Sequence, residues 1–259
     1  MSVWQPGIYL EFADERTRPA AELLQRIPQE TPDLVIDLGC GPGNATGLLR
    51  ARWPAARTVG VDNAPAMLKA ARASGVDAEW QAADIAAWRP DAAPDVIFAN
   101  AVLQWLPDHA GLLPRLLSML APGGVLALQM PRNFTAPSHT IVQQIVETGP
   151  WAERLMPLRD PNPVSRPEQY FAWLSSRAAG LDIWETEYVH VLWGEDAVYR
   201  WISATALAPY LNALKGEEKD AFVRQCKERL GAVYRPRENG ATLFPFRRLF
   251  MVATRGDGR

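Results

Sequence analysis

The chain has 259 residues, of which 48% are hydrophobic, and carries a formal net charge of −2 with a pI near 6.0. This composition excludes an intrinsically disordered protein, and the lack of any run of Lys or Arg gives no indication of a nucleic-acid or membrane partner. No apolar stretch reaches the roughly 20 residues of a membrane span, and residues 1–12 lack a signal-peptide pattern, so we expect a cytoplasmic protein with a small-molecule partner. The two cysteines have no metal-ligand spacing, so no metal site is expected.

Residues 1–28 are predicted to form an arm that contains Tyr9, followed by a lid helix. The helix is expected to start near Thr17 and to bury Leu23. Arg18 lies near its start, where it faces either solvent or a ligand.

A short apolar strand, residues 34–38, runs into a turn with glycines at alternate positions, and Asp37 precedes the first of them by two residues. Glycine lacks Cβ, so its backbone can approach a bound molecule closely. The turn differs from the G-x-G-x-x-G of dinucleotide-binding folds, since Asn44 replaces the last glycine. A carboxylate at position 37 would also repel a phosphate. Both features favour a cationic ligand, and S-adenosyl-L-methionine fits because it carries a sulfonium and an ammonium but no phosphate.

Polar residues stand at four successive strand ends of the predicted sheet: Asp37, Asp62, Asp84 and Asn100. Open α/β sheets bind ligands at the carboxyl ends of their strands, so these side chains are expected to line one crevice. Asp62 lies about 20 residues beyond the glycines, the spacing of an acid that accepts hydrogen bonds from ribose hydroxyls. The alternative is that each is a helix cap or a solvated loop residue.

The remaining pattern predicts a fifth strand at 125–130, a proline-rich helical cap at 131–180, a sixth strand at 182–193, two helices within 197–234 and a last strand at 243–254. The fold class is therefore α/β, with helices on both faces of a mostly parallel sheet. We expect a single domain over residues 1–259 with the cap inserted into it.

Several segments together resemble the class I S-adenosylmethionine-dependent methyltransferases and, within them, are similar to the trans-aconitate 2-methyltransferase family. These segments are Arg16–Pro19, Asp37–Asn44, Phe98–His109, Gln129–Asn133 and Arg248–Phe250. The resemblance implies a Rossmann-like, seven-stranded sheet whose last strand is antiparallel to the rest.

The same resemblance implies cofactor roles for residues at the strand ends. Asp37 and the backbone of Gly39 and Gly41 would hold the methionine part, Asp62 the ribose hydroxyls, Asp84 the adenine amino group, Ile85 the adenine ring and Asn100 the region near the sulfonium. Trp105 would shape the pocket, and Asn63 is also expected to bind the cofactor. The product would be S-adenosyl-L-homocysteine. His109, in the same stretch, is expected to cap a helix or to be solvated.

For a tricarboxylate acceptor such as trans-aconitate, the attacking carboxylate is already ionised at neutral pH, so no general base is expected. Alignment and exclusion of water would then supply most of the catalysis. The acceptor also needs cations and donors to hold its other carboxylates. The predicted substrate residues are Arg18 and Arg248, then His139 and Asn133, and Tyr9 as a hydroxyl donor.

Three alternatives remain open from the sequence. The first keeps the cofactor but methylates another small oxygen, nitrogen or carbon nucleophile, and a hydroxyl or carbon acid would need a base near the sulfonium. The second is a nicotinamide-dependent oxidoreductase, which the missing third glycine and Asp37 disfavour. The third is a regulator that binds S-adenosylmethionine without catalysis.

Overall fold

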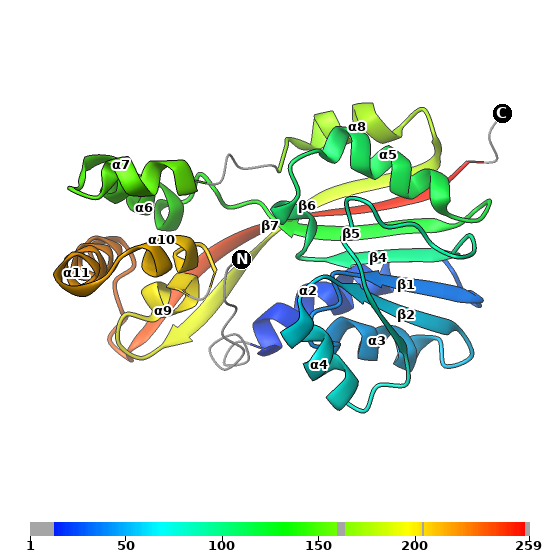
Figure 1. Ribbon diagram of the computed structural model, residues 1–259, viewed down its shortest axis with the longest axis horizontal. Helices are drawn as coiled ribbons and strands as arrows, with labels where there is room; N and C mark the ends of the chain where they lie inside the picture. Colours follow the sequence, from blue (N-terminus) through cyan, green and yellow to red (C-terminus); the bar gives the residue numbers. More distant parts are fainter. Residues whose placement is uncertain (1–12, 160–163, 204, 257–259) are drawn as a thin grey trace. The chain divides into compact units, whose positions relative to one another are not determined.

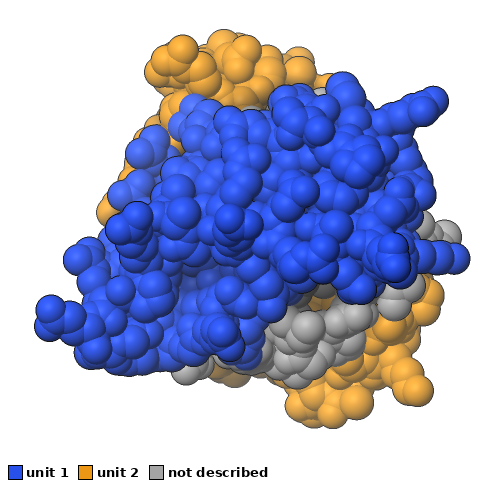
Figure 2. All heavy atoms as spheres, turned by 90° about the vertical axis from the view of Figure 1, so that its left-hand side faces the viewer, with its two compact units in different colours: residues 1–15, 132–162, 187–247 blue, residues 16–131, 163–186, 248–259 orange. Residues whose placement is uncertain are grey.

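The computed structural model describes residues 13–159, 164–203 and 205–256 of the chain. The chain divides into two compact units, which Figure 2 shows in different colours. Unit 1 comprises residues 1–15, 132–162 and 187–247, and unit 2 comprises residues 16–131, 163–186 and 248–259. The predicted contact of Tyr9 with substrate lies outside the described residues.

A seven-stranded sheet with the order β3-β2-β1-β4-β5-β7-β6 runs through the fold (Figure 1). Its strands are β1 (Leu34–Leu38), β2 (Arg57–Asp62), β3 (Glu79–Ala82), β4 (Val96–Asn100), β5 (Val125–Pro131), β6 (Ala178–Trp193) and β7 (Ala241–Arg255). The pairs among β1 to β5 are parallel, and β7 pairs antiparallel with β5. The predicted sheet, including its antiparallel last strand, is confirmed.

Helices cover both faces of the sheet in unit 2. They are α2 (Ala13–Gln25), α3 (Asn44–Arg52), α4 (Pro65–Ala73), α5 (His109–Met119) and α8 (Pro167–Leu174), with the 3₁₀ helix η1 (Leu103–Trp105). The chain steps outward in one direction from β1 to β3 and in the other from β4 to β5. Right-handed crossovers therefore put α3 and α4 on one face and α5 on the other, as Figure 1 shows.

The central strands are buried along nearly their whole length, as their continuous apolar sequences predict. All five residues of β1 and the first four of β4 are buried, whereas β3, at the edge of the sheet, is mostly exposed. In β7, Arg247 is exposed while Arg248 is buried, because neighbouring residues in a strand point to opposite faces of the sheet.

Unit 1 has a hydrophobic core of its own, which includes the fully buried Trp151 and Phe222. Its helices are α6 (Pro137–Thr148), α7 (Ala152–Leu155), η2 (Met156–Leu158), α9 (Ala197–Ser203), α10 (Ala208–Ala213) and α11 (Gly216–Val233). Residues 197–233 thus hold three helices where the sequence predicts two, because the short α10 precedes Gly216, whose φ is 53°.

The two units divide the chain differently from the expected cap at 131–180. Residues 163–186 belong to unit 2, where α8 packs on α5, while 187–247 belong to unit 1 with α6. The reason is side-chain packing between segments distant in sequence, which hydrophobic periodicity does not reveal.

No helix in the described part of the chain is long and apolar enough to cross a membrane. Within the same residues, no group of three or more His, Cys, Asp or Glu side chains is arranged to hold a metal ion.

Candidate functional site

The order of the sheet reverses between β1 and β4, which lie side by side while their connections lead to opposite edges. Asp37 pairs with Phe98 in the parallel register, so the glycine turn and Asn100 follow their strands at the same level. Such a switch point forms the crevice in which open α/β sheets bind ligands. Unit 2 therefore brings together the predicted cofactor residues of β1 and β4.

Gly39 is required by packing inside the turn. Its φ is 72°, and a Cβ placed there would lie 2.2 Å from Cγ2 of Val102, in the loop after β4. Its N–H and that of Cys40 donate to the Val61 carbonyl, at 2.7 and 3.0 Å. The turn is thus fixed between β2 and the β4 loop without any ligand.

Gly41 differs because the space beside it is open. Its φ is 54°, but no atom lies within 4 Å of an added Cβ. Its N–H donates to Oδ2 of Asp62 at 2.9 Å, and this hydrogen bond fixes the position of the Gly41 backbone. A ligand can therefore approach the backbone at Gly41 more readily than at Gly39.

Asp62 ties the glycine turn to the start of α4. Besides accepting from Gly41, it accepts from the Ala64 N–H through Oδ1 at 2.8 Å. A carboxylate offers about four lone-pair positions, so further acceptor capacity remains for hydroxyl groups. Asn63 is exposed and does not cap α4, whose N-cap is Ala64. The contact of Asn63 with the cofactor stays a prediction.

Asp37 is 1% exposed and accepts from the Thr46 hydroxyl through Oδ2 at 2.6 Å. Its other oxygen, Oδ1, has no hydrogen-bond partner among the described residues. Burial raises the pKa of Asp37 to about 7. The hydrogen bond from Thr46 lowers this pKa, and the negative charge of Asp62 raises it by a smaller amount. A cationic group beside Oδ1 would compensate the buried charge, so the site fits the ammonium of an amino acid.

The loop after β3 carries the two residues predicted at the adenine. Asp84 is exposed and accepts from the Ala86 N–H through Oδ1 at 2.9 Å, while Ile85 is buried. Arg115 of α5 donates to three carbonyls of this loop, those of Ile85, Ala86 and Trp88, at 2.8 to 2.9 Å. The sequence analysis did not identify Arg115.

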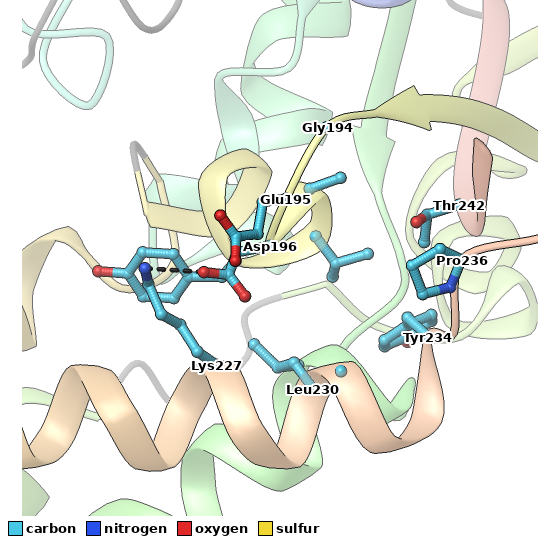
Figure 3. A pocket seen from close by; sticks show the side chains of 12 residues that line it. Gly194, Glu195, Asp196, Lys227, Leu230, Tyr234, Pro236 and Thr242 are labelled. Atoms are coloured by element: carbon cyan, nitrogen blue, oxygen red, sulfur yellow. Dashed lines mark ion pairs between the residues drawn. The ribbon is translucent and has the colours of Figure 1, made fainter. Parts of the chain in front are cut away.

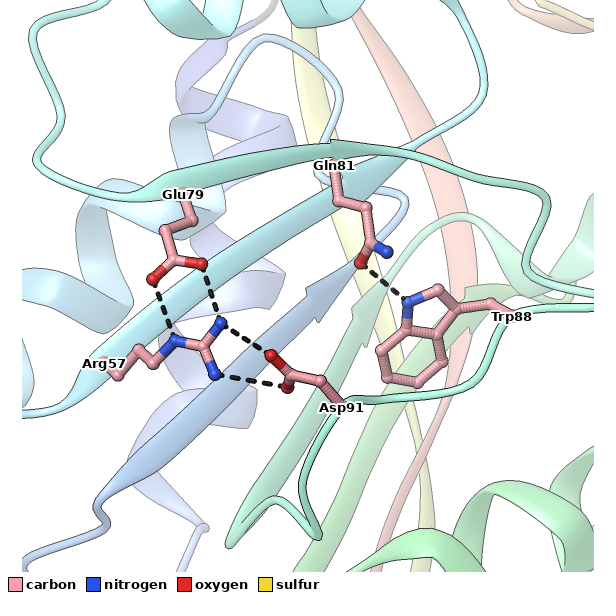
Figure 4. Close-up of polar contacts among 5 residues, drawn as sticks. All are labelled: Arg57, Glu79, Gln81, Trp88 and Asp91. Atoms are coloured by element: carbon pink, nitrogen blue, oxygen red, sulfur yellow. Dashed lines mark hydrogen bonds and ion pairs between the residues drawn. The ribbon is translucent and has the colours of Figure 1, made fainter.

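Two further contacts fix the same loop (Figure 4). The Trp88 indole N–H donates to Gln81 on β3 at 3.0 Å. Arg57 binds Glu79 and Asp91 through four hydrogen bonds of 2.8 to 3.2 Å, which raise the pKa of Arg57 and lower the pKa of both acids. Because Arg57 and Glu79 are the first residues of β2 and β3, this cluster lies at the strand ends opposite the crevice and is structural.

We predict that Arg115→Met lowers cofactor affinity roughly 5- to 10-fold, since the loop loses three hydrogen bonds without losing packing volume. At saturating cofactor, kcat should change little. Calorimetric titration with S-adenosyl-L-homocysteine measures the effect, and Ser118→Ala, one turn further along α5, is the matched control. Unchanged affinity in Arg115→Met would contradict a cofactor contact of this loop.

Asn100 and Arg248 are connected through a residue that the sequence analysis missed. Gln129 of β5 is fully buried, donates to Oδ1 of Asn100 at 2.5 Å and accepts from Nη1 of Arg248 at 3.2 Å. The available signal was a glutamine inside the apolar strand β5, level with the end of β4. The three residues form a polar row across β4, β5 and β7.

The predicted substrate residues fall into both units. Arg18 is exposed on α2 and pairs with Glu22 at 2.7 Å, whereas Arg248 is 4% exposed. Asn133 and His139 lie in unit 1, so their position relative to Arg248 is not part of the described geometry. Asn133 is 4% exposed with both side-chain polar atoms lacking a hydrogen bond to described residues. Burial lowers the pKa of His139 to about 4, so this ring is neutral at pH 7.

Two residues of the stretch after β4 complete the crevice side of unit 2. Trp105 is 46% exposed on η1, and its place in the pocket wall stays a prediction. His109 is 2% exposed: Nε2 lies 2.8 Å from the Leu103 carbonyl and Nδ1 lies 2.7 Å from the Tyr170 hydroxyl. The expectation that His109 caps a helix or is solvated is wrong, because α8 covers it, and Asp108 is the N-cap of α5.

A separate cavity of about 190 Å³ lies within unit 1, lined by residues of α9, α11 and the adjoining loops (Figure 3). Lys227 lines it but is paired with Asp196 at 2.7 Å, and Glu195 adds a second acid. None of the predicted site residues lines this cavity. Its acidic excess is unsuited to a tricarboxylate.

Comparison with known proteins identifies the class to which this fold belongs. A family model described as a methyltransferase domain matches residues 12–186. A putative methyltransferase from Bacillus halodurans C-125 has a similar fold, with a TM-score of 0.56, 14% identity, and coverage of 92% of this chain and 99% of that one. The phosphoethanolamine N-methyltransferase 2 of Haemonchus contortus gives a TM-score of 0.56, 14% identity, and coverage of 93% and 53%. The match over residues 12–186 places the chain in the methyltransferase class, and the two solved structures show that its fold is shared.

Full-length relatives narrow the class. The trans-aconitate 2-methyltransferase of Azoarcus sp. (strain BH72) is 49% identical over 98% of this chain and 100% of its own length. The Methylobacterium radiotolerans enzyme of the same name is 47% identical over 99% and 100%, and that of Escherichia coli O139:H28 is 46% identical over 98% and 99%. The chain belongs to the trans-aconitate 2-methyltransferase family.

Proposed function

We propose that the protein transfers the methyl group of S-adenosyl-L-methionine to a carboxylate of trans-aconitate, releasing S-adenosyl-L-homocysteine. The observation that carries this proposal is the identity of 46% to 49% with trans-aconitate 2-methyltransferases over 98% to 99% of the chain. A cytoplasmic location, without nucleic-acid or membrane partners, is part of the same proposal and is supported by the charge distribution.

The residues at the carboxyl ends of the strands support the assignment of S-adenosyl-L-methionine as the cofactor. When bound, S-adenosyl-L-methionine supplies a methyl group made electrophilic by a sulfonium. Asp37 holds the ammonium of the methionine part through Oδ1, and Gly41 allows close approach of its backbone. Asp62 accepts from the ribose hydroxyls, and Ile85 packs on the adenine. A phosphate beside the buried Asp37 would meet like charge, which disfavours a nicotinamide cofactor.

The residues near the crevice also support a carboxylate acceptor, which needs no base. The histidine that follows β4 most closely, His109, has both ring nitrogens engaged, by the Leu103 carbonyl and the Tyr170 hydroxyl. Burial lowers the pKa of His109, so its ring is neutral and serves to fix η1 against α8. The protein then catalyses the reaction by aligning the carboxylate with the methyl group and by excluding water.

In this proposal an exposed cation, Arg18, and a buried one, Arg248, both bind carboxylates of the acceptor. Arg18 lies on α2, where it pairs with Glu22 at 2.7 Å. Arg248, Asn133 and Tyr9 provide further donors, and His139 acts as a neutral donor because its pKa is lowered to about 4.

An acceptor screen tests the proposal. Cofactor with a labelled methyl group is incubated with trans-aconitate, cis-aconitate, citrate and tricarballylate, and products are identified by mass. We expect a labelled monomethyl ester of trans-aconitate, formed faster than the other esters. No labelled ester with any of the four acids would refute the acceptor, and binding of NADH but not of S-adenosylmethionine would refute the cofactor.

A further inference from the structure

The polar row of Asn100, Gln129 and Arg248 crosses three neighbouring strands within unit 2. Asn100 is in direct register with Gln129, and the next residue pairs along β5 and β7 bring Arg248 opposite Pro131. Gln129 is 0% and Arg248 4% exposed, whereas Asn100 is only partly buried. The row therefore leads from the interior of the sheet to the crevice at its carboxyl end.

The chemistry of arginine fixes the direction of every hydrogen bond in this row. A guanidinium only donates, so the group of Gln129 that faces Arg248 must be its carbonyl, Oε1. The Gln129 amide nitrogen then faces Asn100 and donates to Oδ1. Oδ1 is thereby held toward the interior, and the NH₂ group of Asn100 is the part left to the crevice. Over the described residues, that nitrogen has no hydrogen bond.

The backbone that follows Asn100 is also fixed by hydrogen bonds. Ala101 has a φ of 53°, which is unfavourable for a residue with a Cβ. Its N–H donates to the Gln129 carbonyl at 3.0 Å, and its carbonyl accepts from the Gln104 side chain at 2.7 Å. Asn100 is thus fixed both by its side chain and by the turn that follows it.

We propose that Asn100 donates from its amide nitrogen to a carboxylate oxygen of a bound ligand, and that Arg248, acting through Gln129, holds the amide in the donating orientation. The inference rests on the proposed function for the ligands, both of which carry carboxylates: the methionine part of the cofactor and the acceptor. Gln129 and Arg248 are positioning residues in this arrangement. The polar row selects an anionic oxygen because it turns the acceptor end of Asn100 away.

The Gln129→Glu variant tests the orientation. Glutamate accepts from Arg248 and keeps the side-chain volume, but it can no longer donate to Asn100, which must turn its NH₂ inward and present Oδ1 to the crevice. The ligand carboxylate then meets an acceptor, and we expect a loss of affinity of roughly 10- to 100-fold. Gln129→Met leaves Asn100 free to rotate, so its loss should stay below about 5-fold. A packing role for Gln129 predicts the opposite order.

Two ligand comparisons identify the carboxylate. Binding of S-adenosyl-L-homocysteine is compared with that of its decarboxylated analogue in wild type, Gln129→Glu and Gln129→Met. A loss in Gln129→Glu for S-adenosyl-L-homocysteine alone assigns the cofactor carboxylate. A raised KM for trans-aconitate with unchanged binding of both nucleosides, seen also in Asn100→Asp, which leaves Gln129 and Arg248 unaltered, assigns the acceptor carboxylate. A loss that is equal for the analogue and for S-adenosyl-L-homocysteine, with unchanged KM, overturns the proposal.

A second pair of variants tests the proposal independently, in case Gln129→Glu does not fold. Asn100→Asp presents only acceptors and should weaken the same ligand by roughly 10- to 100-fold, more than Asn100→Ala does. If Gln129→Glu binds no worse than Gln129→Met, or Asn100→Asp no worse than Asn100→Ala, the proposal is overturned. Failure of the proposed function has a different result: the wild-type protein would form no ester of trans-aconitate. The binding of S-adenosyl-L-homocysteine to the variants would still test the orientation of Asn100.

Discussion

The Asp37→Asn variant is expected to lose cofactor affinity on the order of 100-fold at pH 8, because the cationic part of the ligand loses its buried counter-charge. At the same pH the ligand-free protein should become more stable, by roughly 2 to 4 kcal/mol in the free energy of unfolding. The cause is that wild type holds a carboxylate at 1% exposure with one oxygen lacking a partner among the described residues. Isothermal titration with S-adenosyl-L-homocysteine and urea unfolding measure the two effects.

The pH dependence follows from the raised pKa of Asp37, about 7 in the folded state against 3.8 for the unperturbed group. Since the folded carboxyl keeps its proton to higher pH, the ligand-free protein is most favoured relative to the variant below about pH 4. That advantage is lost as the pH rises to about 7. Cofactor affinity changes in the other direction and should rise through pH 7, because the cation binds the ionised form. Asp37→Asn should show neither change.

Thr46→Val is the matched control for this pair of effects. It removes the hydrogen bond to Oδ2 but keeps the carboxyl group, so the pKa of Asp37 should rise further and the pH dependence should shift upward without disappearing. If Asp37→Asn binds the ligand as tightly as wild type at pH 8, Asp37 has no role in binding a cation.

The parallel strands were predictable because they are buried on both faces and their sequences are continuously apolar. The family resemblance implied seven strands with the last one antiparallel to the rest, but the order β3-β2-β1-β4-β5-β7-β6 was not predicted, since periodicity does not reveal which strands are neighbours. The strand-end residues Asp37, Asp62 and Asn100 were predictable because a polar side chain directly after an apolar strand has a defined place at the edge of a parallel sheet.

The supporting residues were not predictable, because their partners are far away in sequence. Arg115 reaches carbonyls 27 to 30 residues before it, and Arg248 reaches Gln129 over a separation of 119. The burial of His109 depends on Tyr170, 61 residues later. A local pattern encodes which residues are polar but not which of them meet, so the substrate residues remain predictions.

Substitution by alanine is expected to have different effects at Gly39 and at Gly41 of the turn. Gly39→Ala should lower the free energy of unfolding by about 3 kcal/mol, because it adds a strained φ of 72° to a contact of 2.2 Å with Val102. Gly41→Ala should cost about 1 kcal/mol, the strain of its φ of 54° alone, because its Cβ meets no atom within 4 Å. Urea unfolding separates the two variants.

The cofactor titration then decides what the open space at Gly41 is for. If the methionine part lies against this backbone, Gly41→Ala should weaken S-adenosyl-L-homocysteine roughly 10-fold or more despite its small effect on stability, because a methyl group would occupy the ligand's space. Gly123→Ala is the matched control: its φ is 74°, its Cβ position is also open, and it lies before β5, at the opposite ends of the strands. Equal affinities of Gly41→Ala and Gly123→Ala would mean that the ligand does not touch the turn at Gly41.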